Sequence, residues 1–402
     1  MQLYILDETY TMIGMVDTYE SMLWMPKYND VGECEIYVLC DNDYLSLLKK
    51  GHYIYRYDDD MFCKIECVEI QTDVENGDHY ICIGMDIAQI LSGRVIQSQT
   101  VFSGKVVNFI ERLLLENVVN APLASRLIPN FRIDTSNFAE FTETIETSAF
   151  GEDLLQRIIS TCKSYNLGFR VSYDVSDGYL VFHLYKGKNK ALATSEEYVE
   201  FSPQFANILT STYKEDDRNY KNVACVRYKD VEEQTHVMWV YVDEEPRFEE
   251  RRELSVDATN INRGVTFEEL VELFPSVKKN ATQSTYYITT GGKTIVVANY
   301  EIREANEGTE ATETITITDY TVEKLARSIG IDALYQMRRV QEFAGDVDTF
   351  DSYVYKIDYN IGDVVKVINE YGIEAEAQIT EVLESDDNEN GHVIEPKFEY
   401  LN

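Results

Sequence analysis

The sequence predicts an α+β protein rich in β-strands, with two similar barrel-like β domains and mixed α/β lobes inserted between them. Three observations lead to this prediction. Apolar and polar residues alternate, as in half-buried strands, through residues 1–92 and again through 345–402. Between these regions, apolar residues fall at helical spacing in three stretches, which are 105–119, 151–166 and 321–344.

The third observation is that the two ends of the chain share one order of elements. Residues 51–83 begin with a glycine and a short strand, pass a polar turn into a longer strand, and reach an Asn-Gly turn before a last strand. Residues 362–394 repeat this order. A generic β-meander could produce the likeness by chance. If it is structural, the two modules are neighbours in space, and three chains present six near-equivalent units around an axis.

This pattern divides the chain into three expected parts. Residues 1–92 form the first β domain. Residues 206–235 plus 345–402 form the second β domain, because the alternating pattern returns there. Residues 93–205 plus 236–344 form the inserted helical and mixed α/β lobes. These lobes are the part of the chain that lies between the two β modules.

Individual elements follow from local signals. The expected strands are 33–40, 53–57, 62–70, 80–83, 169–173, 179–185, 222–229, 236–242, 286–289, 294–300, 314–318, 364–368 and 373–383. Asp177-Gly178 is a hairpin turn between two of them. A capping box at 266–269 opens a short helix that stops before Pro275. The long helix at 321–344 carries an apolar stripe that includes Val340 and Phe343.

Charge excludes several classes of partner. The 402 residues carry a net charge of −35, which repels phosphate and argues against stable binding to nucleic acid or anionic membranes. Such a surface suits solubility, or a wall that must not hold a passing polyanion. No apolar run reaches the ~18 residues of a spanning helix, and the N-terminus lacks the basic start of a signal peptide.

Chemical motifs are scarce. The chain has only 5 histidines and contains no His-Glu-x-x-His, no CxxC pair and no Walker glycine loop. The acidic run 386–391 resembles the start of a calcium loop, but Lys397 stands where a bidentate Glu is required, so we expect a solvated turn. We therefore expect no enzyme and no cofactor, and assign no catalytic, cofactor-binding or metal-binding residue.

The seven cysteines do not form a disulfide framework. Cys63 and Cys67 are expected to share one strand face with Ile65, buried as small apolar side chains in a reducing compartment. A thiol–imidazole pair of Cys162 with His183 is conceivable, but Cys162 lies on the apolar stripe of its helix, which favours an interior role.

Two further clusters have alternative interpretations. The tyrosines at positions 53, 55 and 57 line one face of a strand, which suits either a sugar-stacking platform or a half-buried sheet face or subunit contact. The arginines at 247, 251 and 252 stand among glutamates, which indicates a solvated, salt-bridged surface rather than a phosphate site.

Both ends of the chain carry recognisable stretches. They are LYILD at 3–7, IGMVDTYES at 13–21, GECEI at 32–36, ILSGRVI at 90–96, YNIGDVVKV at 359–367, ITEV at 379–382 and IEPKFEY at 394–400. In these stretches the sequence resembles the siphophage tail-hub proteins of the Tal-like family. The motifs are structural and bring no chemistry of their own.

The resemblance implies a homotrimeric hub beneath the tail tube, similar to the central hub of contractile tails, in which two barrel-like domains per subunit build a pseudo-sixfold ring. It implies a distal tail protein or tail tube, a tape-measure protein and a tip or receptor-binding protein as partners, with DNA only in transient passage and no stable membrane binding. The expected location is the tail tip of the virion, after assembly in the host cytoplasm. Some relatives carry C-terminal peptidase or wall-hydrolase extensions; none is expected after Asn402.

Three functions therefore compete. A structural tail-tip or baseplate hub is favoured by the terminal repeat and the resemblance. A carbohydrate-binding adhesin would use the tyrosine-rich strands, and a cell-wall hydrolase would act without a recognisable motif. Glycan binding and clearing of purified cell wall distinguish the last two from the first.

Overall fold

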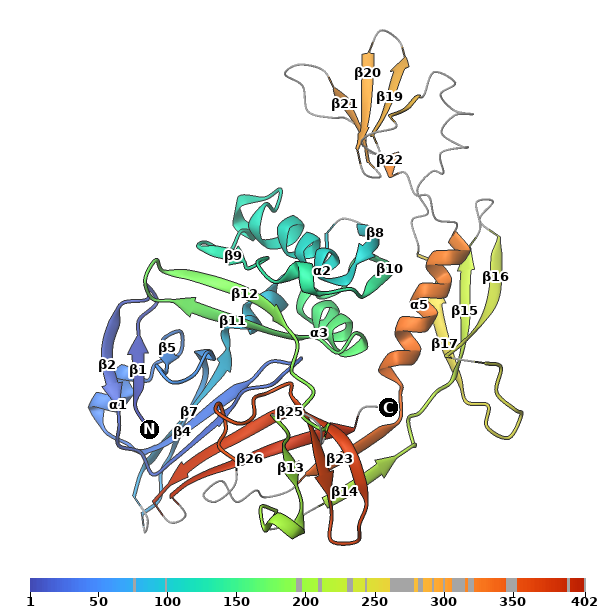
Figure 1. Cartoon of the computed structure of the whole chain (residues 1–402). Coiled ribbons are helices and arrows are strands. Elements are labelled where there is room, and N and C mark those ends of the chain that lie inside the picture. Colours follow the sequence, from blue (N-terminus) through green and yellow to red (C-terminus); the bar gives the residue numbers. More distant parts are fainter. Residues whose placement is uncertain are drawn as a thin grey trace.

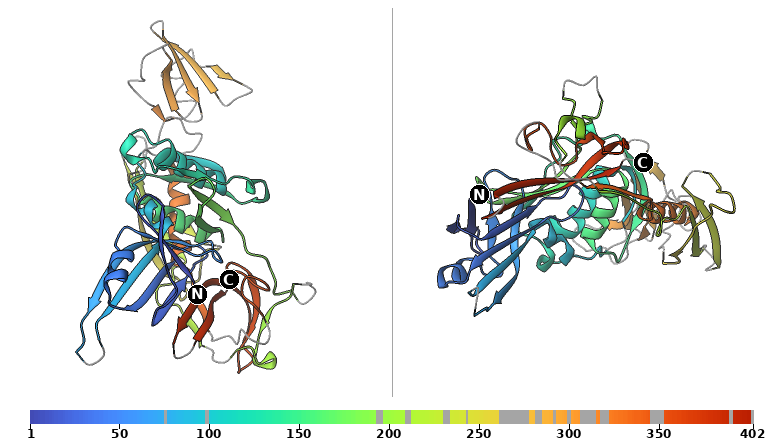
Figure 2. Two further views of the ribbon diagram at one scale, coloured as in Figure 1. Left: turned by 90° about the vertical axis from the view of Figure 1, so that its left-hand side faces the viewer. Right: turned by 90° about the horizontal axis from the view of Figure 1, so that it is seen from below.

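The computed structural model describes most of the chain (Figures 1 and 2). The described residues are 1–74, 77–97, 100–192, 197–208, 212–229, 234–242, 244–260, 278–280, 285–290, 293–298, 301–305, 315–316, 322–344, 353–388 and 391–400. The predicted capping box at 266–269 lies outside them, as does part of each Asn-Gly turn. The structure confirms the predicted α+β class, rich in strands.

One thirteen-stranded sheet contains both ends of the chain, seen in blue and red in Figure 1. Its N-terminal strands are β1 (Leu3–Leu6), β2 (Met12–Val16), β3 (Ser21–Met25), β4 (Glu33–Leu39), β5 (Tyr53–Tyr55), β6 (Phe62–Gln71) and β7 (His79–Asp86). The others are β13 (Glu200–Phe201), β14 (Thr212–Asp216), β23 (Val340–Ala344), β24 (Val364–Ile368), β25 (Glu374–Asp387) and β26 (Gly391–Tyr400). Helix α1 (Asn42–Leu47) connects β4 to β5, capped by Asp41.

The first inserted lobe packs two amphipathic helices against short sheets. Helix α2 (Val106–Leu114) continues into a π-helical turn, Leu115–Val119, and α3 (Leu154–Ser164) is capped by Asp153. Around them lie β8 (Thr100–Lys105) paired with β10 (Thr144–Ala149), and β9 (Phe131–Ile133) and β11 (Gly168–Asp174) on either side of β12 (Tyr179–Tyr185). Short helices occur at Ile87–Gly93, Ala124–Arg126, Phe138–Glu140 and Pro203–Phe205. The helices predicted at 105–119 and 151–166 and the hairpin at 169–185 are therefore confirmed.

The second inserted lobe combines a three-stranded sheet with one helix. Helix α5 (Val322–Gln336) packs on β15 (Val223–Lys229), which lies between β16 (Thr235–Tyr241) and β17 (Glu253–Ala258). A further sheet follows the order β18 (Lys278–Asn280), β19 (Thr285–Thr290), β20 (Lys293–Ala298), β21 (Glu301–Ala305) and β22 (Ile315–Thr316). Strands β19 and β20 form the predicted hairpin. Among the described helices, none is long and apolar enough to cross a membrane.

The prediction of one helix through 321–344 was wrong at its C-terminal end. The Met337 amide closes on the Leu334 carbonyl at 2.9 Å, and residues 340–344 form β23 between β14 and β26. Phe343 is buried there beside Phe398, with ring centroids 6.0 Å apart. The predicted helical stripe included Phe343 because a single apolar residue fits both the helical period and the strand period. The contact with the sheet decides in favour of the strand.

The prediction that Cys63, Ile65 and Cys67 share a buried face was wrong for Cys67. A β-bulge between Ile65 and Cys67 inserts one unpaired residue and reverses the alternation. Cys63 is therefore buried and Cys67 is exposed. All seven cysteines are free.

The sheets also suggest different domain boundaries. Strand β15, in the segment 206–235 expected to belong to the second β domain, pairs with β16 and β17 instead. Strand β23, expected in an inserted lobe, joins the large sheet. We propose that residues 1–92 and the segments 197–216 plus 340–400 form the two sheet modules.

Candidate functional site: the joint between two sheet modules

The two ends of the large sheet have the same strand pairing. We call β1 and β3–β7 the first module, and β13, β14 and β23–β26 the second module. Adding one constant to the residue numbers converts the pair Cys63↔Asp86 of the first module into Ala377↔Tyr400 of the second. The same constant converts each of the other β6–β7 pairs into a β25–β26 pair. The predicted repeat at 51–83 and 362–394 is therefore present as one strand ladder.

Irregular features coincide as well. The bulge of β6 after Ile65 corresponds to the bulge of β25 after Ile379. Gly51 and Gly362 both have positive φ, 97° and 91°, a region that favours glycine. The Gly51 amide donates to the Ile65 carbonyl at 2.9 Å, and the Gly362 amide donates to the Ile379 carbonyl at 2.7 Å. A shared bulge and a shared turn glycine go beyond what alternation in a generic meander requires.

The likeness extends to the outer strands. In the first module β7 is followed across the sheet by β4 and β3, and in the second β26 is followed by β23 and β14, all antiparallel. One difference lies at the other side, where β1 is antiparallel to β5 but β13 is parallel to β24. Six strands thus correspond in position, where the sequence predicted three.

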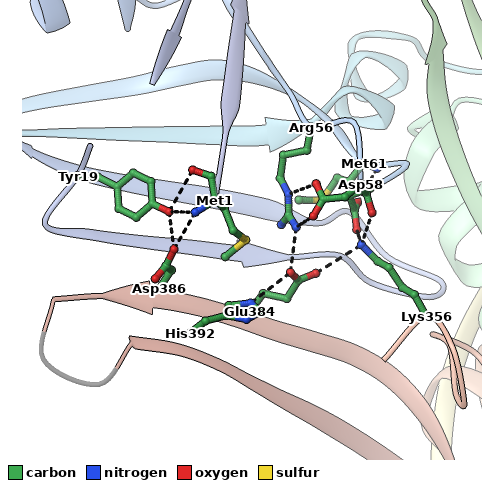
Figure 3. Close-up of polar contacts among 10 residues, drawn as sticks. Met1, Tyr19, Arg56, Asp58, Met61, Lys356, Glu384, Asp386 and His392 are labelled. Atoms are coloured by element: carbon green, nitrogen blue, oxygen red, sulfur yellow. Dashed lines mark hydrogen bonds and ion pairs between the residues drawn. The ribbon is translucent and has the colours of Figure 1, made fainter. Parts of the chain in front are cut away.

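The modules are joined edge to edge through β25 (Figure 3). The first part of β25 pairs with β24, and its last part, from Glu384 to Asp387, pairs with β3 of the first module. The Tyr28 amide donates to the Thr380 carbonyl at 2.9 Å, which continues the contact beyond the regular pairing. The bulge before Glu381 bends β25 away from one neighbour and toward the other.

A buried ion pair lies at this joint. The Arg56 side chain is 1% exposed, and its Nη2 lies 3.0 Å from Glu384 Oε2 and 2.7 Å from Asp58 Oδ2. Although burial lowers the pKa of Arg56, its hydrogen bond to Asp58 and the charge of Glu384 raise that pKa above the usual range. The guanidinium also lies over the Trp24 ring, 5.0 Å from the centroid. Arg56 is therefore charged, and its Nε and Nη2 donate to the carboxylates of Asp58 and Glu384.

More contacts across the joint surround this pair. Lys356 Nζ lies 2.6 Å from Asp59 Oδ2 and 3.7 Å from Glu384 Oε1. The Tyr19 hydroxyl donates to Asp386 at 2.5 Å. Burial opposes ionisation of Asp386, but the bonds from Tyr19 and the Met1 ammonium prevail and lower its pKa. If one member of a buried ion pair is removed, the charge of the other member is left buried without a partner, which is costly. These contacts therefore fix how the two modules are oriented.

The first inserted lobe is anchored beside the joint. Tyr28, in the loop after β3, donates from its hydroxyl to the Asn166 carbonyl at 3.1 Å. The backbone of Gly187 approaches Gly362 so closely that a Cβ at Gly187 would lie 1.7 Å from the Gly362 carbonyl oxygen. Lys190 and Asp363, both buried, form an ion pair at 3.2 Å. The chain leaving the lobe is thus held against the second module.

The predicted chemical candidates resolve as follows. Cys162 is buried on α3, while the two ring nitrogens of His183 bond Ser172 at 2.9 Å and Asp134 at 3.2 Å, so the thiol–imidazole pair does not form. In the acidic run at 386–391, Asp386 contacts Tyr19 instead of standing open as a first calcium ligand. The described residues contain no cluster of three or more His, Cys, Asp or Glu that could hold a metal.

Ser172, His183 and Asp134 form a hydrogen-bonded series that the sequence analysis missed. Its order of hydroxyl, imidazole and carboxylate is that of a nucleophile, base and orienting acid. Burial, followed by the charge of Arg170, lowers the pKa of His183 and favours the neutral ring. Ser172 lies diagonally across the β11–β12 ladder from His183, and Asp134 follows β9 on the next strand. We interpret the series as a bridge across three strands.

The tyrosine and arginine clusters are also placed. Tyr53 is buried against Tyr10 and Phe62, with ring centroids 4.8 and 5.2 Å away, whereas Tyr57 is 63% exposed beyond the end of β5. Tyr53 is therefore a core residue rather than part of a platform. Arg251 bonds Glu253 at 2.7 Å, as expected for a salt-bridged surface.

The fold and the joint define a β-rich protein in which two like modules share one sheet. The chain belongs to the family of siphovirus ReqiPepy6 Gp37-like proteins, whose model matches residues 2–398. The expected relationship to siphophage proteins, based on the two chain ends, is thereby confirmed. A search of curated proteins finds no match.

Several solved structures are similar to this chain over nearly its whole length. The tail protein from Neisseria meningitidis MC58 is 12% identical with a TM-score of 0.51, and the match covers 99% of this chain and 95% of that one. The prophage tail protein gp18 from Listeria monocytogenes EGD-e is 12% identical with a TM-score of 0.48, covering 99% and 94%. The prophage MuSo2 43 kDa tail protein from Shewanella oneidensis is 10% identical with a TM-score of 0.49, covering 99% and 98%.

Proposed function

We propose that the protein is a structural component of a phage tail tip, in which three copies form a ring of six near-equivalent sheet modules below the tail tube. The observation that carries this proposal is the shared strand ladder of the two modules and the edge-to-edge joint between them. A chain that already contains two like units in one sheet adapts a threefold assembly to a sixfold neighbour. Family membership and the fold of the Neisseria tail protein support the same role.

The partners follow from this position. The ring would contact the distal tail protein or tail tube and the tape-measure protein on one side, and a tip or receptor-binding protein on the other. DNA would pass through without being held, because a net charge of −35 disfavours lasting contact with phosphate. The protein would act in the virion after assembly in the host cytoplasm, without catalysis.

Light scattering coupled to size exclusion tests the assembly. The chain has a mass of 46.4 kDa, and we expect three times this mass at micromolar concentration. A single-chain mass over the whole concentration range, with and without the purified tail tube, would contradict the proposed ring.

The hydrogen-bonded series of Ser172, His183 and Asp134 gives the enzymatic alternative a specific test. If the Ser172–His183–Asp134 series were catalytic, the protein would clear purified cell wall and Ser172→Ala would abolish clearing. Our proposal expects no clearing by either protein.

The adhesin alternative is tested with a glycan array. Binding that is lost on replacing the exposed Tyr57 would favour sugar recognition, and we expect no such binding.

A further inference from the structure

We propose that neighbouring copies of this chain are joined by β6 of one copy pairing antiparallel with β14 of the next, in the register that joins β25 to β3 within each chain. This inference rests on the proposed ring and names the surface that builds it. The partner is a second copy of the same chain, and the contact is head to tail, so a closed ring follows if the rotation per joint closes.

Strand β6 occupies the same position in the first module as β25 does in the second, but the edge that β3 covers in β25 is left uncovered by the described strands in β6. Strand β5 pairs with β6 only at residues 62–64, and within the described part of the chain no strand pairs with that side of β6 beyond them. In β25 the corresponding side is covered by β3. Val68 and Ile70 are accordingly 38% and 53% exposed, whereas the corresponding Val382 and Glu384 are buried. An exposed strand edge with apolar side chains is a template for pairing with another chain.

Strand β14 supplies the complementary edge. It is the terminal strand of the sheet order and pairs with β23, as β3 pairs with β4. Trp24 lies opposite Cys34, and Tyr213 lies opposite Phe343, which is the counterpart of Cys34. Tyr213 is therefore the counterpart of Trp24, the residue through which β3 meets β25.

The internal joint fixes the register of the proposed one. Glu384 lies opposite Trp24, and Lys27 bridges to Glu381. Transferred to the corresponding residues, these pairs place Ile70 opposite Tyr213 and Cys67 opposite Asp216 in the next copy. Transferred in the same way, Glu69 lies opposite Lys214.

Charge and bulge agree with this register. Glu69 and Lys214 are both exposed and have opposite charges, which favours a directly opposed cross-strand pair. The bulge in β6 occupies the same place as the one in β25, where the strand leaves one neighbour and takes up another. The first module therefore has the backbone geometry of a joint that the single chain does not complete.

A cysteine cross-link tests the register directly. Cys67 is exposed, so Asp216→Cys places two thiols on opposed residues of neighbouring copies, at a spacing compatible with a disulfide. Under mild oxidation we expect a covalent ladder up to three chains. Glu215→Cys, one residue away on the opposite face of β14, is the matched control and should cross-link at least about tenfold less. The ladder should disappear when Cys67→Ser is added.

Charge exchange provides a second test. Glu69→Lys places two lysines opposite each other and should weaken association roughly five- to tenfold, since about 1.4 kcal/mol corresponds to a factor of ten. Adding Lys214→Glu should restore association, because each joint then has opposite charges again. Recovery in the double variant excludes misfolding of the single one.

The outcomes separate this inference from the proposed function. A threefold mass with no Cys67-dependent cross-link, or with equal cross-linking by both cysteine variants, overturns the register while the ring stands. A single-chain mass under all conditions overturns the ring and the register together. A cross-link specific to Asp216→Cys with charge-exchange recovery supports both.

Discussion

The two sheet modules have one strand ladder but fill it with different side chains. In the first module Gly84 lies opposite Cys34. A Cβ at Gly84 would lie 2.8 Å from the Cys34 Sγ. In the second module the corresponding pair is Phe398 and Phe343, both buried. The bulge and the turn glycine, which are backbone features, therefore keep the same register in both modules, whereas the side chains at these facing positions are small in the first module and large in the second.

A second difference concerns what covers each module. The last part of β25 is buried by β3 and contributes Glu384 to the ion pair with Arg56. The corresponding part of β6 is exposed and has Ile70 at the equivalent position. The same backbone position thus carries a buried carboxylate in β25, where the joint lies within the chain. In β6, where we propose a joint between copies, it carries an apolar side chain.

The largest expected effect comes from breaking the joint. Glu384→Ala leaves Arg56 buried near Asp58 alone, and we expect the free energy of unfolding to fall by about 3–5 kcal/mol. Ile70→Ala at the corresponding site of the first module should change the stability of the single chain by less than about 0.5 kcal/mol. Urea denaturation of both variants under monomeric conditions measures the contrast. Equal losses would show that the two sites are not distinguished by the joint.

Next come the matched turn glycines. Gly51→Ala should cost about 1–2 kcal/mol from the left-handed backbone alone, because its new Cβ meets only the flexible Glu8 side chain at 3.2 Å. Gly362→Ala also places a Cβ 2.4 Å from the Tyr28 ring and should cost about 2–4 kcal/mol. Gly372, with φ of 75° and open space around it, is the control for backbone strain. A Gly362 variant no less stable than the other two would contradict the packing argument.

The small facing pair Gly84 and Cys34 of the first module predicts a smaller effect. Gly84→Ala should destabilise by about 1–3 kcal/mol, because the added methyl group overlaps Cys34. Adding Cys34→Ala removes the Sγ atom and should recover part of the loss. Thermal unfolding of the single and double variants measures the coupling; strict additivity would mean that the two side chains do not compete for this space.

The last expected difference between the modules concerns pH dependence, which Asp86 gives to the first module. Burial is the main cause that raises the pKa of Asp86 from 3.8 to about 7 in the folded chain, against the hydrogen bond from the Ala88 amide. The stability that its proton provides is therefore complete below about pH 4 and is lost as pH rises through about 7.

Asp86→Asn should remove this dependence. As pH rises from 4 to 7, we expect the free energy of unfolding of the parent to fall relative to that of the Asp86→Asn variant. Denaturation at several pH values measures the difference, and parallel curves for the two proteins would show that Asp86 ionises normally.

The sequence predicted what depends on local pattern. Alternation located β4, β6 and β7, and apolar stripes located α2 and α3. The turn glycines and the order of strands showed the repeat. Prediction failed where long-range pairing decides, as for Phe343 in β23 and for Cys67 after the bulge. One inserted residue reverses which side chains are buried, and nothing in the local sequence marks it.

The joint itself could not be predicted. Arg56 and Glu384 are 328 positions apart in the sequence. Their pairing depends on the contact between β25 and β3, which no periodicity shows. The Ser172–His183–Asp134 series was missed for the same reason, because it spans three strands of one small sheet.

Electron cryo-microscopy of the purified assembly tests the central claim most directly. We predict three copies around an axis, with the modules of residues 1–92 and of 197–216 plus 340–400 alternating as six equally spaced units in a continuous ring of strands. A map in which the two modules lie at different radii or heights, or in which copies meet through the inserted lobes instead, would contradict it.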